Sequence, residues 1–340
     1  MDKEIKAMVM SAGVGSRLEP LTLSIPKPLV PIANKPVMTI LFEKLAQIGI
    51  KDVICNTYYL SEQIIDRYSN NDLGINFNYI VEDTLSGTAG GVKKCQKFFD
   101  KNSTFVVLSG DGLTNADIKK GIEIHQKSNA IATIGIKRIP QEYVSHFGVV
   151  VTDSKGFITE FQEKPSVEEA KSSFINTGIY IFDYKIFDYI PQNTFYDFAK
   201  NVFPKLLEEH AINTFEITEY WSDIGTLDQY KQTTLDLFDG RYSFSHAAIV
   251  NTDCGQYISA SDNIDKSVKF VGCSTIGQNS VIGKNTIIEN SIIWDNVYIA
   301  DNVTVKNCII ASNSKIYSDI NSQIIGANEI IGNEVIKSST

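Results

Sequence analysis

The stretch AMVMSAGVGSRL at residues 7–18 determines how the chain begins to fold. Its first four residues are apolar and its centre contains Gly13 and Gly15, a pattern that predicts a buried strand running into a loop. Glycine permits positive φ angles and a close approach of the backbone to a ligand, so successive amide N–H groups can converge on phosphate oxygens. The stretch therefore predicts a strand followed by an anion-binding loop.

Two cationic side chains follow these glycines. Arg17 offers a planar fork of donors that suits phosphate, and Lys27 adds a point charge. Lys27 lies in the stretch IPKPLVP at residues 25–31, where three prolines stiffen the backbone that carries it. A stiff segment loses less entropy when it presents a cation to a ligand.

Two common glycine-rich motifs fit this loop poorly. The Rossmann fingerprint requires a third glycine where this chain has Leu18, and the Walker A loop ends in Gly-Lys-Ser/Thr, which is absent from the stretch. An ordinary strand-to-helix turn is the simpler alternative. A turn does not explain why Gly-x-Gly-Ser-Arg-Leu is followed eight residues later by Pro-Lys-Pro-Leu.

The composition is that of an ordinary globular protein. With 340 residues, 43% of them hydrophobic, the chain is long enough for two domains. Its net charge of -9 disfavours nucleic acid or an anionic membrane as a partner. No apolar run approaches the roughly 18 residues of a membrane span, and residues 1–4 do not resemble a signal peptide, so we expect a cytoplasmic protein. Five widely spaced cysteines without a Cys-x-x-Cys pair predict reduced thiols.

Apolar runs alternate with helix-period segments up to about residue 240. The candidate strands are 52–56, 75–81, 105–108, 131–136 and 178–182, and the candidate helices are 37–48, 61–68 and 118–126. This alternation predicts an α/β domain with a largely parallel sheet. Ligands of such domains bind beyond the carboxyl ends of the strands.

The pattern changes in the last part of the chain. Ile276-Gly277 and Ile282-Gly283 recur six residues apart, are continued by Ile288, and are followed by further short apolar clusters between polar residues. This period predicts a β-solenoid of hexapeptide repeats, in which stacked coils bury a shared core. The predicted boundaries are a first domain at 1–240, a linker and lead-in at 241–267, and the repeats at 268–336.

Residues 11–31 resemble the signature of the sugar-1-phosphate nucleotidyltransferases, which is written Gly-Gly-x-Gly-Thr-Arg-Leu with a later Pro-Lys-Pro. Ala12 replaces the first glycine and Ser16 replaces threonine, both by small residues that preserve the loop. The resemblance implies a Rossmann-like catalytic domain with a mostly parallel mixed sheet, and the resemblance of the repeats to hexapeptide-repeat proteins implies that a left-handed parallel β-helix follows it. It also implies nucleotide binding by Ala12, Gly13, Gly15 and Ser16, and catalytic roles for Arg17 and Lys27.

The stretch VEDTLSGTAGGV at residues 81–92 predicts a strand, a loop and the start of a helix. Its small residues would let a flat base lie against the backbone, and a flexible connecting loop is an equally simple interpretation. Gly-Thr-Ala-Gly is similar to the base-recognition loop of mannose-1-phosphate guanylyltransferases. That resemblance implies nucleotide binding by Gly87 and Thr88, and Glu82 could accept hydrogen bonds from the N1–H and amino group of guanine.

Two aspartates are candidate magnesium ligands. Asp111 ends the buried run VVLSGD, and Gly110 leaves room beside it for a nucleotide. Magnesium bound to a triphosphate takes one or two protein carboxylates. The alternative for Asp111 is a helix N-cap, although Asn115 and Asp117 are better placed for that. The resemblance makes Asp223 the second ligand, and the alternative is that it caps a helix at 227–235.

The sugar side of the site comes from the resemblance. An exposed Glu-Lys-Pro is normally a solvated turn, but the family uses such a glutamate on sugar hydroxyls and such a lysine on the sugar phosphate. Glu163 and Lys164 inherit these roles. Asn176 and Gly178 match an Asn-x-Gly that closes over the sugar ring, and Gly148 matches a glycine whose backbone approaches the sugar.

The implied reaction is attack of a sugar-1-phosphate oxygen on the α-phosphorus of a nucleoside triphosphate, with release of pyrophosphate. Because a phosphate monoester is already an anion near neutral pH, no general base is needed, and catalysis consists of positioning and charge neutralisation. The base loop favours GTP and mannose-1-phosphate, giving GDP-mannose. The alternative is UTP or dTTP with glucose-1-phosphate or another hexose- or heptose-1-phosphate.

Two other functions are weighed against this one. Many hexapeptide solenoids are acyltransferases with a histidine base, but His125, His146, His210 and His246 all precede the repeats. A catalytically silent regulatory subunit of the same fold should have lost the charged residues that this chain retains. We therefore expect the repeats to serve assembly or regulation, with the chain forming a homo-oligomer through them.

Overall fold

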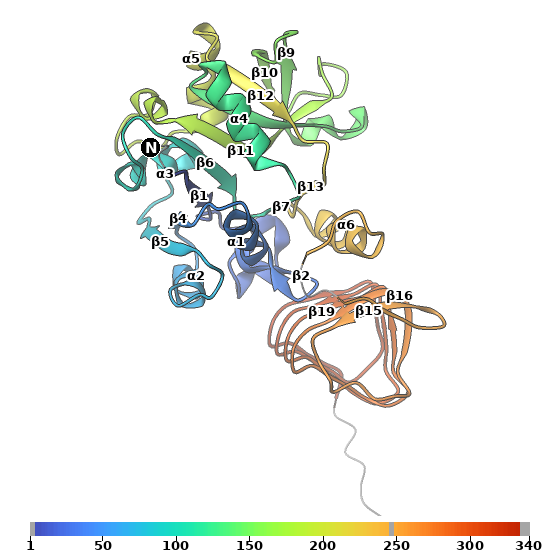
Figure 1. The fold of residues 1–340 in the computed structure, drawn as a ribbon. Coiled ribbons are helices and arrows are strands. Elements are labelled where there is room, and N and C mark those ends of the chain that lie inside the picture. Colours follow the sequence, from blue (N-terminus) through green and yellow to red (C-terminus); the bar gives the residue numbers. More distant parts are fainter. Residues whose placement is uncertain (1–3, 245–247, 334–340) are drawn as a thin grey trace, which may run out of the picture. The chain divides into compact units, whose positions relative to one another are not determined.

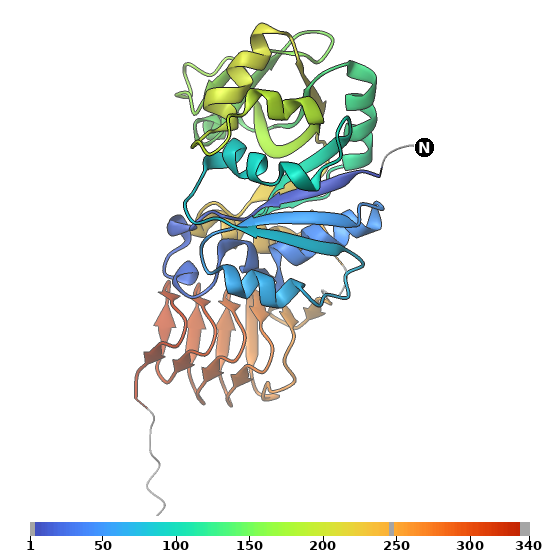
Figure 2. The same ribbon diagram turned by 90° about the vertical axis from the view of Figure 1, so that its left-hand side faces the viewer.

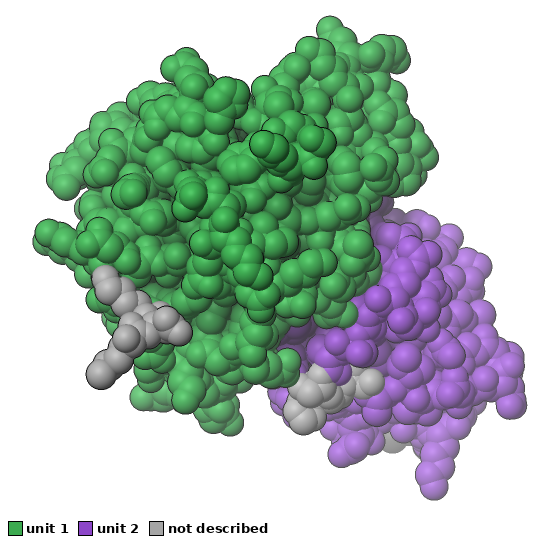
Figure 3. All heavy atoms as spheres, turned by 45° about the horizontal axis from the view of Figure 1, so that its top comes forward, with its two compact units in different colours: residues 1–14, 41–223 green, residues 15–40, 224–340 purple. Residues whose placement is uncertain are grey.

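The computed structural model describes residues 4–244 and 248–333. The predicted boundary at residue 336 and His246 lie outside the described residues. The chain packs into two compact units, one of residues 1–14 and 41–223 and the other of residues 15–40 and 224–340 (Figure 3). This division reflects which residues pack together, and it cuts the signature stretch between residues 14 and 15. The domain boundaries at residues 240 and 267 remain a prediction.

The first unit is built on a mixed sheet with the order β10-β9-β11-β6-β1-β4-β5, extended by β8 and β12 (Figure 1). Strands β6, β1, β4 and β5 run parallel, whereas β11 pairs antiparallel with β6, β8 and β9. The strands of this sheet are β1 (Lys6–Met10), β4 (Asp52–Thr57), β5 (Asn76–Val81), β6 (Thr104–Ser109), β8 (Ala132–Arg138), β9 (Gly148–Thr152), β10 (Ile158–Glu163), β11 (Phe174–Asp183) and β12 (Ile212–Glu216).

Helices flank this sheet (Figures 1 and 2). They are α2 (Ser61–Tyr68), α3 (Gly87–Lys94), α4 (Ile118–Ser128) and α5 (Phe203–Glu208), while α1 (Val37–Gln47) contains residues of both units. The core between sheet and helices is rich in phenylalanine, and the Phe99 and Phe105 rings stack with centroids 4.1 Å apart. The predicted helices and strands are therefore confirmed to within a few residues, and so is the α/β class.

The predicted repeats form a parallel β-helix in the second unit. Short strands stack coil upon coil, as Figure 2 shows, and the equivalent isoleucines 276, 293, 310 and 325 lie in register along one inner face. The coils contain β14 (Val250–Asn251), β15 (Gly255–Ser259), β16 (Lys269–Ile276), β17 (Val281–Ile282), β18 (Ile287–Glu289), β19 (Ile292–Ile293), β20 (Tyr298–Ile299), β21 (Thr304–Lys306), β22 (Ile309–Ile310), β23 (Lys315–Ile316), β24 (Ile320–Asn321), β25 (Ile324–Ile325) and β26 (Ile330–Ile331).

The β-helix packs against the part of the signature stretch that belongs to its own unit. Tyr230 on α6 (Leu227–Phe238) is fully buried, and its hydroxyl donates to the carbonyl oxygen of Pro31 over 2.7 Å. The same hydroxyl accepts a hydrogen bond from Trp294 Nε1 of the β-helix at 2.9 Å. Asn34, in the turn between β2 (Pro31–Ile32) and β3 (Lys35–Pro36), donates to the Ile276 carbonyl at 2.8 Å. The β-helix thus supports the backbone that carries the predicted catalytic lysine.

No helix within residues 4–244 and 248–333 is long and apolar enough to cross a bilayer.

Candidate active site

The loop after β1 is fixed to the neighbouring parallel strand β4. Ser11 is buried, its backbone N–H donates to Asn56 Oδ1 at 3.1 Å, and its hydroxyl donates to the Asn56 carbonyl at 2.7 Å. Ala12 is buried next to it, whereas Gly13 is exposed. Only the first residues of the loop are therefore anchored in the sheet, and its backbone beyond them is accessible to a ligand.

Glu82, directly after β5, joins three chain segments. Its Oε1 accepts from Asn56 Nδ2 at 2.7 Å, and its Oε2 accepts from Lys94 Nζ at 3.0 Å and from the Ser86 hydroxyl. The side chain is almost fully buried, so these bonds offset the cost of placing a carboxylate inside the protein. Both oxygens are engaged within the protein, and the predicted contact with guanine stays a prediction.

Gly91 is required for this network because a Cβ there would lie 2.6 Å from Asn56 Nδ2. Two further glycines of α3 face the chain near Tyr196. A Cβ on Gly87, whose φ is +76°, would come within 2.4 Å of the Tyr196 carbonyl oxygen, which accepts from the N–H of Gly90 at 3.0 Å. Thr88 donates to Asp197 at 2.9 Å. The small residues of this loop therefore allow close packing against the protein's own backbone, and their role toward a base stays a prediction.

The remaining part of the signature stretch lies in the second unit. Gly15 has a φ of +76°, and a Cβ there would lie 2.9 Å from the Cβ of Lys27. Its carbonyl oxygen accepts from the Thr22 hydroxyl at 2.9 Å, which closes the loop around the lysine-bearing segment η3 (Lys27–Leu29). Arg17 is exposed on the single turn η1 (Ser16–Leu18). The glycine predicted to bind phosphate and the lysine predicted to act on it are thus neighbours.

The two predicted metal ligands are brought together by a short ribbon of two strands. Asp111 precedes β7 (Gly112–Thr114), and Asp223 ends β13 (Trp221–Asp223), which pairs antiparallel with β7 so that Asp223 lies opposite Gly112. Asp111 Oδ1 accepts from the Ser109 hydroxyl at 2.5 Å. The cap of α6 is Thr226, whose hydroxyl accepts from Gln229 N, and the cap of α4 is Asp117. Neither candidate carboxylate is therefore the residue that caps these two helices.

This pair of carboxylates fits a magnesium site of the predicted kind. Among the residues that the structure describes, no group of three or more His, Cys, Asp or Glu side chains is arranged to hold a metal ion. Magnesium in nucleotide enzymes typically takes one or two carboxylates and fills its other positions with water and phosphate oxygens. Asp111 and Asp223, whose backbones are brought close by the β7–β13 pairing, would supply these carboxylates.

The Asn-x-Gly turn in β11 lies beside the aspartate site. Gly178 has a φ of +74°, and a Cβ there would lie 3.3 Å from the Cβ of Ser109. Asn176 holds the turn, because its Oδ1 accepts from Gly178 N and its Nδ2 donates to the Tyr180 hydroxyl, both at 3.0 Å. Burial raises the pKa of Tyr180, so its hydroxyl stays protonated. Asn176 and Gly178 are thus placed next to the strand that carries Asp111.

The predicted sugar-binding residues meet across the β9–β10 hairpin. Glu163 pairs with Gly148, and a Cβ on that glycine would lie 3.4 Å from Glu163 Oε2. Lys164 is exposed, has a φ of +48° and donates its backbone N–H to the Phe147 carbonyl at 3.2 Å. Phe147 packs edge-on against Trp221, with ring centroids 5.8 Å apart. This contact links the hairpin to the strand that ends in Asp223.

Three residues that position the site gave no signal of that role in the sequence. Asn56 and Ser109 hold predicted site residues through the bonds given above, and Trp221 Nε1 donates to the Thr177 carbonyl at 3.0 Å. Each was read only as part of a strand or a flanking residue. Gly110 is buried, and its N–H donates to the Met10 carbonyl at 2.8 Å, which ties the aspartate loop to β1.

The fold is that of an α/β protein whose strand-end loops carry glycines, cations and two candidate metal-binding aspartates, residue types that suit a phosphorylated ligand. The chain belongs to the nucleotidyl transferase family, whose model matches residues 6–240. Its curated relatives include several sugar-1-phosphate nucleotidyltransferases. Together with the signature stretch, they place the chain among the sugar-1-phosphate nucleotidyltransferases.

Two curated relatives differ in the substrates that their names give. A UTP–glucose-1-phosphate uridylyltransferase of Synechocystis is 39% identical over 80% of this chain and 78% of its own length. A mannose-1-phosphate guanylyltransferase of Mycobacterium tuberculosis is 32% identical over 70% of this chain and 66% of its own length. A solved structure of a putative glucose-1-phosphate thymidylyltransferase from Bacillus anthracis matches with a TM-score of 0.62 and 26% identity, over 71% of this chain and 98% of its own.

Proposed function

We propose that this protein transfers a nucleotidyl group from a nucleoside triphosphate to a sugar-1-phosphate and releases pyrophosphate. The observation that carries this proposal is the pairing of β7 with β13, which puts Asp223 opposite Gly112, the residue after Asp111, while the Gly178 turn lies against Ser109 of the same loop. A catalytically silent member of the family would be expected to have lost the charged residues that this chain retains at these positions.

Each charged residue has one task in this reaction. Arg17 and Lys27 neutralise the triphosphate, and Lys164 neutralises the phosphate of the sugar. Asp111 and Asp223 would hold Mg²⁺, which when bound shields phosphate oxygens and so lowers the repulsion between the two substrates. Because the sugar phosphate carries its own negative charge, no side chain has to remove a proton from it.

The remaining residues contribute mainly by positioning the two substrates, and they transfer no proton. Glu163 and the backbone at Gly148 bind the sugar hydroxyls, and Asn176 with Gly178 closes over the ring. Ala12, Gly13, Gly15 and Ser16 contact the phosphates through their backbone N–H groups. Gly87, Thr88 and Gly110 line the path of the nucleotide.

The first candidate substrate pair is UTP with glucose-1-phosphate. It is supported by the 39% identity to the uridylyltransferase, a match that covers 80% of the chain. The engagement of both Glu82 oxygens by Asn56, Ser86 and Lys94 also weakens the case for that carboxylate as a reader of guanine. The second candidate is GTP with mannose-1-phosphate, supported by the Gly-Thr-Ala-Gly loop and by the guanylyltransferase relative.

The experiment is a matrix of pyrophosphate release. Purified full-length protein is given each of UTP, GTP, dTTP and ATP with glucose-1-phosphate or mannose-1-phosphate, at fixed Mg²⁺. The first candidate predicts the highest kcat/KM for UTP with glucose-1-phosphate. Preference for GTP with mannose-1-phosphate would select the second candidate, and no release in any combination would refute the proposed reaction.

A further inference from the structure

The turn that carries Arg17 is tied to the rest of the signature stretch by a single carbonyl group. The Gly15 carbonyl oxygen accepts from the backbone N–H of Leu18 and from the hydroxyl of Thr22, both at 2.9 Å. The first bond closes η1, and the second joins η1 to the next turn, η2 (Leu21–Leu23). The two turns thereby form one small closed loop.

The closing groups of this loop are buried, whereas its cation is accessible. Thr22 is 2% exposed and Leu18 is fully buried, but Arg17 is exposed. Gly15 has a φ of +76°, and a Cβ there would lie 3.2 Å from the Thr22 methyl carbon. The backbone on both sides of Arg17 is therefore fixed from within the protein, and the arginine side chain can still reach a ligand.

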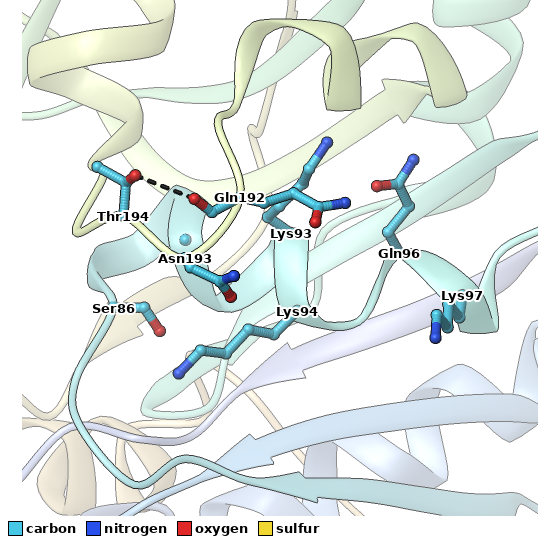
Figure 4. A pocket seen from close by; sticks show the side chains of 9 residues that line it. Ser86, Lys93, Lys94, Gln96, Lys97, Gln192, Asn193 and Thr194 are labelled. Atoms are coloured by element: carbon cyan, nitrogen blue, oxygen red, sulfur yellow. Dashed lines mark hydrogen bonds between the residues drawn. The ribbon is translucent and has the colours of Figure 1, made fainter.

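The lysines that follow the predicted base loop do not form a cation cluster of their own. Lys93 and Lys94 on α3 and Lys97 on η4 (Gln96–Phe98) line a polar pocket and point in different directions (Figure 4). The ammonium groups of Lys93 and Lys94 are each held by an acceptor of the protein, at 2.6 and 3.0 Å. The proposed reaction therefore depends on how the signature stretch presents its two cations to the triphosphate.

These two cations are supported in different ways. Lys27 lies between Pro26 and Pro28, and its carbonyl accepts from the Val30 N–H at 3.1 Å. Proline fixes φ, so this backbone is stiff by itself. Arg17 lies on a single 3₁₀ turn of three residues without a proline, and an isolated turn of this kind is weak. Its orientation depends on a bond that reaches the turn from outside.

We propose that Thr22 is a positioning residue for triphosphate binding, which acts through the Gly15 carbonyl to hold Arg17 in its binding orientation. The proposal rests on the role given to Arg17 in the function proposed above. Without the Thr22 hydroxyl, the Gly15 carbonyl keeps its bond to the Leu18 N–H, so the fold persists. The turn loses its restraint, and ordering Arg17 on the triphosphate then costs affinity.

The experiment is a double-mutant cycle in the full-length protein. Calorimetric titration with UTP and with GTP, at fixed Mg²⁺ and without sugar-1-phosphate, compares wild type, Thr22→Val, Arg17→Ala and the double variant. Valine keeps the shape of threonine and removes its hydroxyl. We expect Thr22→Val to weaken nucleotide binding roughly fivefold, the equivalent of one hydrogen bond. Arg17→Ala should weaken binding further, and the double variant should bind no more weakly than Arg17→Ala.

Two more variants separate positioning from a loss of stability. Thr22→Ser keeps the hydroxyl and should bind nucleotide as the wild type does. Thr234 on α6 is also 2% exposed, and its hydroxyl donates to the Tyr230 carbonyl at 3.1 Å. Thr234→Val should therefore lower the free energy of unfolding about as much as Thr22→Val, while leaving nucleotide affinity unchanged.

The proposal is overturned by additive losses in the double variant, by wild-type affinity in Thr22→Val, or by absence of nucleotide binding in the wild type. If Arg17→Ala binds nucleotide as tightly as the wild type, Arg17 does not contact the triphosphate and the role of Thr22 is wrong as well. The reaction is judged separately by pyrophosphate release, because the titration contains no sugar phosphate and requires no turnover.

Discussion

Asn56 Nδ2 donates to Glu82 Oε1 over 2.7 Å, and this bond joins the ends of the parallel strands β4 and β5. The same asparagine accepts from the backbone N–H of Ser11 after β1. One amide side chain thereby links the predicted phosphate loop to the predicted base loop. The Asn56 amide group donates through Nδ2 and accepts through Oδ1. Aspartate cannot replace it, because its carboxylate would then lie against the carboxylate of Glu82.

Asn56→Ala should destabilise the protein and weaken nucleotide binding. It leaves the Ser11 N–H and Glu82 Oε1 buried without their partner, which costs roughly 1–3 kcal/mol per group. Urea unfolding should show this loss, and the KM for the nucleoside triphosphate should rise more than kcat falls. Asn78, which is exposed on β5, provides the matched control. Asn78→Ala should change neither the free energy of unfolding nor the KM. A wild-type KM in Asn56→Ala would show that the link does not position the nucleotide.

Asp111→Asn and Asp223→Asn should each lower Mg²⁺-dependent turnover by about 100-fold or more, because each removes one of two negatively charged ligands. Circular dichroism should show an intact fold in both variants. The double variant should be little worse than either single one, since residues that act as a unit are not additive. Asp66→Asn, on the exposed face of α2, is the control. Full activity in Asp223→Asn would remove it from the metal site.

Tyr230→Phe should weaken the attachment of the signature segment to the β-helix. The lost hydroxyl bridges the Pro31 carbonyl and Trp294 Nε1, so two buried groups lose a partner, at about 1–3 kcal/mol each. Because Lys27 is only four residues from Pro31, we also expect lower kcat. Tyr298→Phe, on the exposed side of the β-helix, removes a hydroxyl without these contacts and should behave as wild type. An unchanged kcat in Tyr230→Phe would show that this contact with the β-helix does not affect catalysis.

His125 should make stability depend on pH. Burial lowers the pKa of this histidine from 6.5 to about 4, and its Nδ1 lies 2.9 Å from the Thr133 hydroxyl. Between pH 6.5 and 4 the unfolded chain binds a proton that the folded protein does not, so stability falls as the pH falls, by up to about 3 kcal/mol. Above pH 6.5 this residue has no such effect.

The measurement is the difference in unfolding free energy between wild type and His125→Gln at pH 7.5 and pH 4.5. The glutamine side chain is uncharged at both pH values and can still form a hydrogen bond with Thr133. The wild type should lose more stability than the variant on acidification. An identical loss in both proteins would show that His125 is not the group responsible.

Much of the fold was predictable because its periodic patterns report burial directly. The helix predicted at 61–68 has those bounds, and the six-residue spacing of Ile276, Ile282 and Ile288 places each on an inner face of the β-helix. The β7–β13 ribbon was not predictable, because its three-residue strands are too short to show a period and pair across more than a hundred residues. Asn56 gave no signal either, since a polar residue at a strand end is ordinary in sequence.

The same limit applies within the predicted site. Gly87 and Gly90 were read as making room for a base, and the structure shows backbone near Tyr196 in the space where their side chains would be. A glycine in a sequence indicates that another group packs closely against the backbone, but it does not show whether that group is a ligand or part of the protein. Glu82 is predicted to accept hydrogen bonds from guanine, and only the folded chain reveals that Lys94 and Asn56 already engage its carboxylate.

In the proposed reaction, an oxygen of the sugar phosphate attacks the α-phosphorus of the triphosphate. This attack is followed by using sugar-1-phosphate labelled with ¹⁸O in its non-bridging phosphate oxygens and analysing the product by mass spectrometry and ³¹P NMR. We predict that one labelled oxygen becomes the bridge to the α-phosphorus, that the remaining label stays on the sugar phosphate, and that pyrophosphate leaves unlabelled. Labelled pyrophosphate, or an unlabelled bridge in the nucleotide sugar, would rule out this attack.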